Sequence, residues 1–294
     1  LLKLQNMGRR PYINMSLKTK ERIAGLLLVR VPLAIFLIVI LFPFFWILST
    51  SLKQPQEIMS SVLTYIPENL TFENYKKVWS SIGFSRYFLN SFCASGVAVI
   101  NVTIISLLGG YALARYKFAG KGVVMMLLLL TQMIPGIILV IPLFRVWLRL
   151  RLNNTLYSLM LTYSTTQLPF CMVMMSGFFA GLPKELEEAA QIDGCTLLGA
   201  LFRVLIPTIA PGIVATGAFA FVNSWNDFVY ALNFINDQKL FTLPVGLSMM
   251  KGEFTIDYGA LCAGCIISLI PVLLLFAYIQ KYLVKGLASG AVKG

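Results

Sequence analysis

The stretch that decides the fold lies near the N-terminus, at residues 31–49, and reads VPLAIFLIVILFPFFWILS. It carries no charged residue, and about 20 apolar residues are enough for a helix to cross the hydrocarbon core of a bilayer. A secretory signal peptide has a shorter apolar core and ends in small residues, whereas this run ends in Phe44, Phe45 and Trp46. We therefore predict a membrane-spanning helix over residues 27–50.

The rest of the chain repeats this pattern. Of the 294 residues, 58% are hydrophobic and 12% are charged, about half the charged share of an average soluble domain. Five further apolar runs predict spanning helices at residues 88–114, 123–147, 156–180, 209–232 and 259–280, and Pro135 and Pro142 interrupt the second of these five. The predicted fold class is an all-α integral membrane protein with six transmembrane helices.

The distribution of cations predicts the orientation in the membrane. With six spans, both termini lie on one side, and that side carries 15 of the 24 Lys and Arg residues while the opposite side carries 9. Cytoplasmic loops are enriched in Lys and Arg, so we predict that both termini are cytoplasmic. One loop disagrees, because Arg145, Arg149 and Arg151 fall on the outer side.

Composition excludes several functions. The chain has no histidine, which removes Ser-His and Cys-His catalysis and most transition-metal sites. Five cysteines occur, and Cys262 and Cys265 form the only C-x-x-C, so a zinc site is not expected. The Lys and Arg residues that give the net charge of +12 lie at the edges of apolar runs. They form no basic stripe of the kind that binds nucleic acid. We predict no enzyme activity, metal, cofactor or nucleic acid.

The polar segment 181–208 carries the most specific pattern. Pro183 suits a first helical position, Glu185, Glu187 and Glu188 suit a first turn, and Gly194 suits a helix end. We expect a short helix, then an apolar stretch along the membrane surface, and a new span that begins at Pro207. From these residues alone, an ordinary amphipathic connector between two spans explains the segment equally well.

This segment resembles the loop shared by permease subunits of bacterial ABC sugar importers, the binding-protein-dependent transport inner-membrane family. The shared pattern is Glu-Ala-Ala, three residues, Gly, nine residues and Ile-x-Leu-Pro, which here becomes Glu188, Ala189, Ala190 and Gly194 with Val204, Ile206 and Pro207 at its end. Residues 110–115, 182–186 and 224–228 are also similar to the sugar branch. The tail resembles that of the smaller permease subunit of the maltose importer.

The resemblance implies a division of the chain into parts. Residues 1–26 would form a cytoplasmic N-terminal segment, residues 27–284 the permease domain with a core unit at about 87–281, and residues 285–294 a cytoplasmic tail. Within segment 181–208, a coupling helix would dock on an ATP-hydrolysing subunit through Glu188, Ala189, Ala190, Gly194 and Pro207. The tail would dock between the ATP-hydrolysing subunits through Lys285, Gly286, Gly290 and Lys293, although chain ends are also often frayed.

The resemblance also implies partners. The chain has no Gly-x4-Gly-Lys-Ser/Thr phosphate loop, so the ATPase would be a separate subunit. The assembly would contain a second homologous permease, two ATP-binding subunits and an extracellular or periplasmic solute-binding protein, in the bacterial plasma membrane. The implied function is passage of a carbohydrate, with an oligosaccharide favoured, through half of a translocation pathway. Glycerol phosphate and related solutes are the alternative cargo.

Polar residues inside the apolar runs are candidates for the substrate pathway, because such groups face a cavity or another helix. Amides, hydroxyls and aromatic rings suit a sugar, and the candidates are Gln132, Tyr163, Gln167, Asn223, Trp225, Asn226 and Asp227. Hydrogen bonds between helices are the plainer explanation for any one of them. A self-sufficient secondary transporter is a further alternative, but it would be expected to carry an internal repeat and intramembrane acids.

Overall fold

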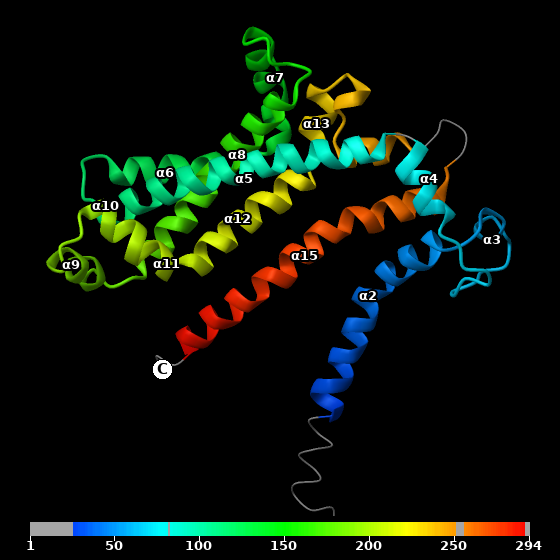
Figure 1. The fold of residues 1–294 in the computed structure, drawn as a ribbon, viewed down its shortest axis with the longest axis horizontal. Helices are drawn as coiled ribbons and strands as arrows, with labels where there is room; N and C mark the ends of the chain where they lie inside the picture. Colours follow the sequence, from blue (N-terminus) through cyan, green and yellow to red (C-terminus); the bar gives the residue numbers. More distant parts are fainter. Residues whose placement is uncertain (1–25, 82, 251–255, 292–294) are drawn as a thin grey trace, which may run out of the picture.

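In the computed structural model, the backbone is described for residues 26–81, 83–250 and 256–291, and side chains are described for residues 28–80, 83–250 and 256–281. Within these ranges the chain is built from helices, which confirms the predicted all-α fold (Figure 1). Leu28–Ser51, Phe84–Arg115 and Tyr258–Lys281 are each long and apolar enough to cross a membrane. Three bent helix pairs pass the same test, so the described residues provide up to six spans.

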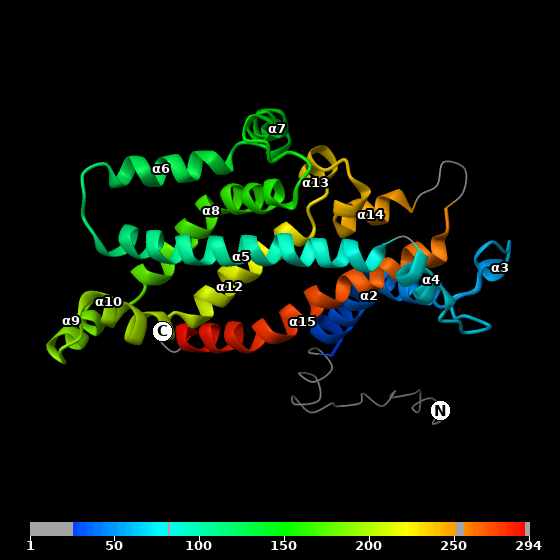
Figure 2. The ribbon, with the colours of Figure 1, turned by 45° about the horizontal axis from the view of Figure 1, so that its top comes forward.

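The long helices form a bundle with one outlying arm. Helices α5 (Phe84–Arg115), α8 (Leu156–Ala180) and α12 (Ala210–Trp225) pack on one another, and α15 (Tyr258–Ala291) packs on α12. Helix α2 (Val31–Ser51) follows the π-helical turn η1 (Leu26–Arg30) and packs on α15 (Figures 1 and 2). Residues 28–45 are exposed, so this arm presents apolar side chains on all its faces.

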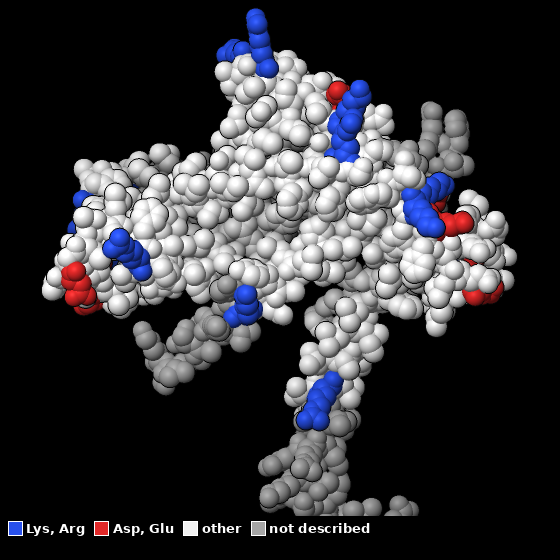
Figure 3. Space-filling model, in the orientation of Figure 1, with Lys and Arg blue, Asp and Glu red and all other residues white. Residues whose placement is uncertain are grey.

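Shorter helices connect the long ones. They are α3 (Pro55–Ile58), α4 (Glu73–Ser81), α6 (Lys121–Gln132), η2 (Gly136–Leu139), α7 (Val140–Arg149), α9 (Glu185–Ile192), α10 (Leu197–Ala200), η3 (Leu201–Leu205), α11 (Ile206–Thr208), α13 (Val229–Phe234), η4 (Gln238–Leu240) and α14 (Leu243–Met249). Charged side chains gather near the ends of the long helices and at the tip of α7, and a broad uncharged band separates them on the face drawn in Figure 3. This pattern fits a bilayer around the bundle.

Two predicted spans do not form single straight helices. The third breaks between α6 and the segment 136–149, which bend by 96° at Pro135, because proline lacks the N–H that would continue the helix. The fifth was expected over 209–232; α12 begins at Ala210 and not at Pro207, and it meets the preceding segment Leu197–Thr208 at 76°. It ends at Trp225, and α13 follows as a separate helix.

Small residues allow the two central helices to approach closely. On α5 the buried residues Ala94, Ala98 and Val102 are four apart and therefore share one face. A Cβ atom added to Gly110 would lie 2.8 Å from the Cβ atom of Met175 and 2.9 Å from the backbone nitrogen of Ser176 on α8. Glycine at this contact therefore brings the two backbones together, as small residues do in membrane bundles.

Helix α4 fastens the ends of α2 and α15 to each other. The buried Asn74 side chain donates hydrogen bonds of 2.9 Å to the carbonyl of Ser51, the last residue of α2, and to that of Lys53 just beyond it. Lys77 on the same helix forms an ion pair with Asp257, one residue before α15. The described part of the connection between α2 and α5 therefore forms a structured cap over these helix ends.

Candidate functional site: the α9 segment

Helix α9 is closed at its C-terminal end by Gly194. The backbone N–H of Gly194 bonds to the carbonyl of Gln191, and that of Cys195 bonds to the carbonyl of Ala190, both at 3.0 Å. These two bonds form a Schellman motif, in which the residue after the helix is left-handed, and Gly194 has φ of +87°. Gly194 thus ends the helix as predicted, whereas α9 begins at Glu185, two residues after Pro183.

A buried acid attaches α9 to the end of α5. Glu187 is 9% exposed, and its Oε1 accepts a hydrogen bond of 2.5 Å from the hydroxyl of Tyr111. Its Oε2 lies 3.2 Å from Nε of Arg115, and the Arg115 guanidinium also donates to the carbonyl of Leu182 at 3.1 Å. Charge-assisted contacts that are buried in this way hold two elements in one geometry. Helix α9 is therefore fixed to the bundle.

The opposite face of α9 is uncovered. Glu188, Ala189 and Gly194 are exposed, while Ala190 lies on the buried side. Ile192 is 86% exposed and Leu198 on α10 is 62% exposed. Pro207 lies in α11, at the far end of the same segment. The structure therefore brings most of the predicted coupling residues to one end of the molecule, where an apolar and acidic surface faces outward.

The structure also reveals a functional contact that the sequence analysis missed. Glu187 was interpreted only as an acid in a first helical turn, yet it makes the buried contact with Tyr111, 76 positions away. Glu187 and Ala190 are three residues apart and both buried, so they lie on one helix face. This spacing is the local signal that could have indicated that Glu187 shares the buried face of the helix. Nothing local indicates the partner residues on α5.

The candidate pathway residues fall into separate groups. The Tyr163 hydroxyl donates a 2.9 Å hydrogen bond to Asp227, whose carboxylate also accepts from the N–H of Ala231 at 3.1 Å, at the start of α13. The Gln167 amide donates to the hydroxyl of Ser224 at 2.8 Å, joining α8 to α12. The Gln167 Oε1 atom is buried without a hydrogen-bond partner. Two buried polar links therefore connect α8 with α12 and α13.

The remaining candidates lie elsewhere. Trp225 is 2% exposed, packs on Phe88 and Phe221, and donates to the carbonyl of Ser268 at 3.1 Å. Asn223, Asn226 and Gln132 are exposed. Lys285, Gly286 and Gly290 fall in α15, whose backbone is helical there while their side chains lie outside the described part. Lys293 lies outside the described residues altogether.

The chain matches the family model described as "Binding-protein-dependent transport system inner membrane component" over residues 105–289, more than half of its length. The chain belongs to this family. Its members are permease subunits of ABC transporters, and this one is a multi-pass membrane protein. The family predicted from the segment 181–208 is therefore confirmed. Among the described residues, no group of three or more His, Cys, Asp or Glu is placed so that it could hold a metal ion.

Several curated relatives align over most of this permease. It is 37% identical to the sulfoquinovosyl glycerol transport system permease protein of Agrobacterium fabrum, covering 86% of this chain and 89% of the relative. It is 34% identical to a diacetylchitobiose uptake system permease protein of Streptomyces coelicolor, covering 94% and 100%. It is 32% identical to the trehalose/maltose transport system permease protein of Thermococcus litoralis, covering 94% and 99%.

A solved structure shares the fold. It is a chain of a bacterial ABC transporter involved in the import of the acidic polysaccharide alginate, with a TM-score of 0.79 and 22% identity. The similarity covers 90% of this chain and 97% of that one. The arrangement of helices described above is therefore that of an ABC importer permease.

Proposed function

We propose that this permease is one half of the translocation pathway of an ATP-driven importer for a carbohydrate, with an oligosaccharide favoured. It carries no ATPase of its own and works with a second homologous permease, two ATP-binding subunits and an extracellular solute-binding protein. The names of the relatives support the cargo, since they concern sulfoquinovosyl glycerol, diacetylchitobiose and trehalose/maltose. The cellular location in this proposal is the bacterial plasma membrane, with six spans and cytoplasmic termini.

The observation that carries the proposal is the two-sided character of α9. One side is fastened to α5 through Glu187, Tyr111 and Arg115, and the other side exposes Glu188, Ala189 and Ile192. A helix that is rigidly held on one side and open on the other transmits the motion of whatever docks on it. Closure of an ATP-binding dimer on this face would therefore displace α5 and its bundle, which changes access to the pathway.

The remaining parts of the pathway follow from the same arrangement. Asn223 and Asn226 are exposed at the end of α12, and exposed amides at membrane depth suit a polar cavity shared with the second permease. Tyr163, Gln167 and Asp227 lie close to this end and brace it, while Trp225 joins α12 to α15. The proposed contact with the cargo also includes Gln132 on α6. The proposed contact with the ATPase also includes the tail residues Lys285, Gly286, Gly290 and Lys293.

Substitutions in α9 and its cap test the docking face. Glu188→Gln removes an exposed charge, and Gly194→Ala places a side chain at φ of +87°, a strain of about 1–2 kcal/mol. We expect both variants of the assembled importer to insert normally and to lose most of the cargo-stimulated ATP hydrolysis. The measurement is ATPase activity in proteoliposomes with and without the loaded binding protein.

Matched controls separate docking from general damage. Glu73→Gln removes an exposed acid from the first turn of α4, outside the α9 segment, and Gly122→Ala adds a side chain in open space at an ordinary φ. Both controls should keep coupled hydrolysis near the wild-type level. Normal coupling and uptake by Glu188→Gln and Gly194→Ala together would contradict the assignment of α9 as the docking helix.

A further inference from the structure

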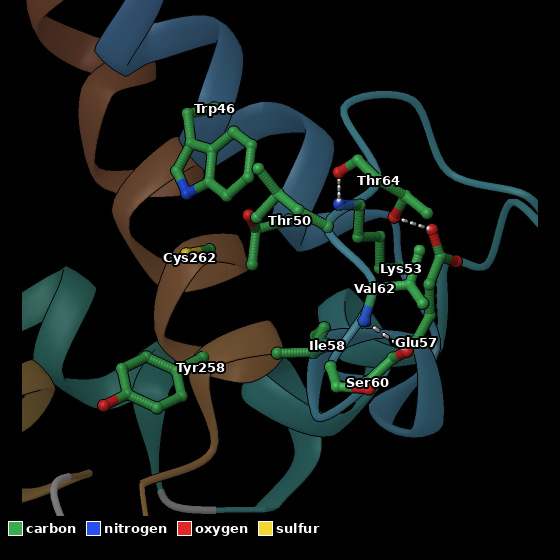
Figure 4. Close-up of a pocket in the computed structure, with 12 residues that line it drawn as sticks. Trp46, Thr50, Lys53, Glu57, Ile58, Ser60, Val62, Thr64, Tyr258 and Cys262 are labelled. Carbon is green, nitrogen blue, oxygen red and sulfur yellow. Dashed lines mark hydrogen bonds between the residues drawn. The ribbon is translucent and has the colours of Figure 1, made fainter.

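A cavity of about 280 Å³ lies where α2 ends, between the 57–64 loop and the start of α15 (Figure 4). Its lining combines one cation, one acid, hydroxyl groups and aromatic rings. The residues used below are Trp46, Thr50, Lys53, Glu57, Ser60 and Tyr258. None of them belongs to the α9 segment or to the candidate pathway. The cavity therefore lies outside the residues that the proposed function uses.

The cation in this cavity is buried without an anion. Lys53 is 5% exposed, and its ammonium donates to the carbonyl of Thr64 and lies 5.1 Å from the ring centroid of Trp46. In Figure 4 its side chain points toward Thr64, and a dashed line marks the hydrogen bond between them. Within the described residues, Lys53 forms no ion pair. Because a buried charge needs a partner, the cavity favours a ligand that brings a negative group to Lys53.

The acid that lines the cavity, Glu57, uses only one of its two oxygens. Glu57 Oε1 accepts from the hydroxyl of Thr64 at 2.6 Å and from the N–H of Glu68 at 3.2 Å. Its second oxygen accepts no hydrogen bond from a described residue. A simple anion would be repelled by this carboxylate. A ligand that carries a phosphate for Lys53 and an ammonium for Glu57 satisfies both groups.

The position of the cavity indicates where such a ligand comes from. Helix α2 is apolar and exposed over residues 28–45, so hydrocarbon chains surround it, and Trp46 and Tyr258 are aromatic residues at the end of this apolar length. Trp and Tyr at such a level mark the boundary between hydrocarbon and water. A volume of about 280 Å³ suits a headgroup whose acyl chains remain outside along α2.

We propose that this cavity binds the headgroup of a phospholipid with a primary ammonium, such as phosphatidylethanolamine. Lys53 holds the phosphate, with the hydroxyls of Thr50 and Ser60 nearby, and Glu57 holds the ammonium. The lipid fastens α2 to the start of α15, at the point where α4 also joins them. This binding is independent of the cargo and of docking at α9.

Thermal unfolding and native mass spectrometry of the purified full-length chain test the proposal. Phosphatidylethanolamine should raise the unfolding midpoint by about 2 °C or more relative to phosphatidylcholine, whose quaternary ammonium cannot donate to Glu57. Lys53→Gln should lower occupancy by the lipid about tenfold, because one charge-assisted contact is lost. Lys53→Arg should keep the occupancy of the wild type. Lys76→Gln, which removes an exposed cation on α4, should behave as wild type.

Three results would overturn the proposal. The first is equal stabilisation of the wild-type chain by both lipids, which needs no variant to fold. The second is unchanged lipid occupancy in Lys53→Gln. The third is displacement of the lipid by soluble glycerophosphoethanolamine at equal concentration, which would make a free phosphate compound the ligand.

Discussion

At the scale of single residues, Glu187 is the most informative position in this permease. An acid at the edge of a membrane protein usually remains solvated, yet this one is buried between Tyr111 and Arg115. Removing one partner of a buried charged pair leaves the other uncompensated, which costs more than the pair itself contributes. The contact therefore holds α9 to the end of α5.

Substitutions of the two partners should show this dependence. Arg115→Met leaves Glu187 buried without its cation, with an expected destabilisation of about 3–5 kcal/mol. Tyr111→Phe removes one hydrogen bond to a charged group, with an expected loss of about 1–3 kcal/mol. Thermal unfolding in detergent measures both. Tyr116→Phe is the matched control, since Tyr116 is 45% exposed; an equal loss in that variant would contradict a specific role for the buried contact.

Asp257 provides a second prediction at the residue scale, which concerns how the stability of the folded chain depends on pH. Burial alone would raise the pKa of this carboxyl, but the N–H of Ala260 and the ammonium of Lys77 outweigh it, and the net pKa is lowered. A lowered folded-state pKa adds stability above the unfolded value of about 3.9, and that stability is lost as pH falls through the folded value.

The unfolding midpoint should therefore be higher in wild type than in Asp257→Asn at neutral pH. The difference should shrink as the pH falls below about 4, because protonation then removes the wild-type charge as well. Glu68→Gln, which changes an exposed acid on the same side, should show no such difference. A wild-type advantage that persists at low pH would contradict the role of the ion pair.

At the scale of elements, the sequence predicted the positions of the long helices well and the bends between helices poorly. Continuous apolar runs located α2, α5, α8 and the start of α15 to within a few residues, because a span must be long and apolar whatever it packs against; α15 itself continues past the predicted end at residue 280 to Ala291. The 96° bend at Pro135 does not interrupt hydrophobicity, so it is invisible to that signal. Contacts such as Glu187 with Tyr111 or Asn74 with Ser51 depend on tertiary structure and have no local pattern.

The contact between α5 and α8 can be tested with two glycines of one helix. Gly110→Ala forces a Cβ atom against Met175 and the backbone of Ser176, and overpacking of this kind costs about 1–3 kcal/mol. Gly96→Ala meets nothing within 4 Å and should be neutral or stabilising by up to about 1 kcal/mol through helix propensity. Unfolding midpoints that fall equally in both variants would contradict the close contact.

At the scale of the whole molecule, several surfaces of this permease are not covered by the rest of the chain. Helix α2 is exposed along its apolar length, α6 has no buried residue, and the α9 face is open. Large exposed apolar surfaces are covered by lipid or by partner subunits. The apolar runs and the charge pattern predict a membrane protein from sequence alone, whereas the exposed face of α9 is seen only in the structure.

Uptake by proteoliposomes measures the central claim most directly. Vesicles that contain this chain alone should not accumulate a labelled oligosaccharide with or without ATP. Vesicles that also contain the second permease and the ATP-binding subunits, supplied with binding protein, should accumulate it only when ATP is present on the side of α9. Accumulation by the chain alone, without ATP, would contradict the account of a permease half that is moved through α9.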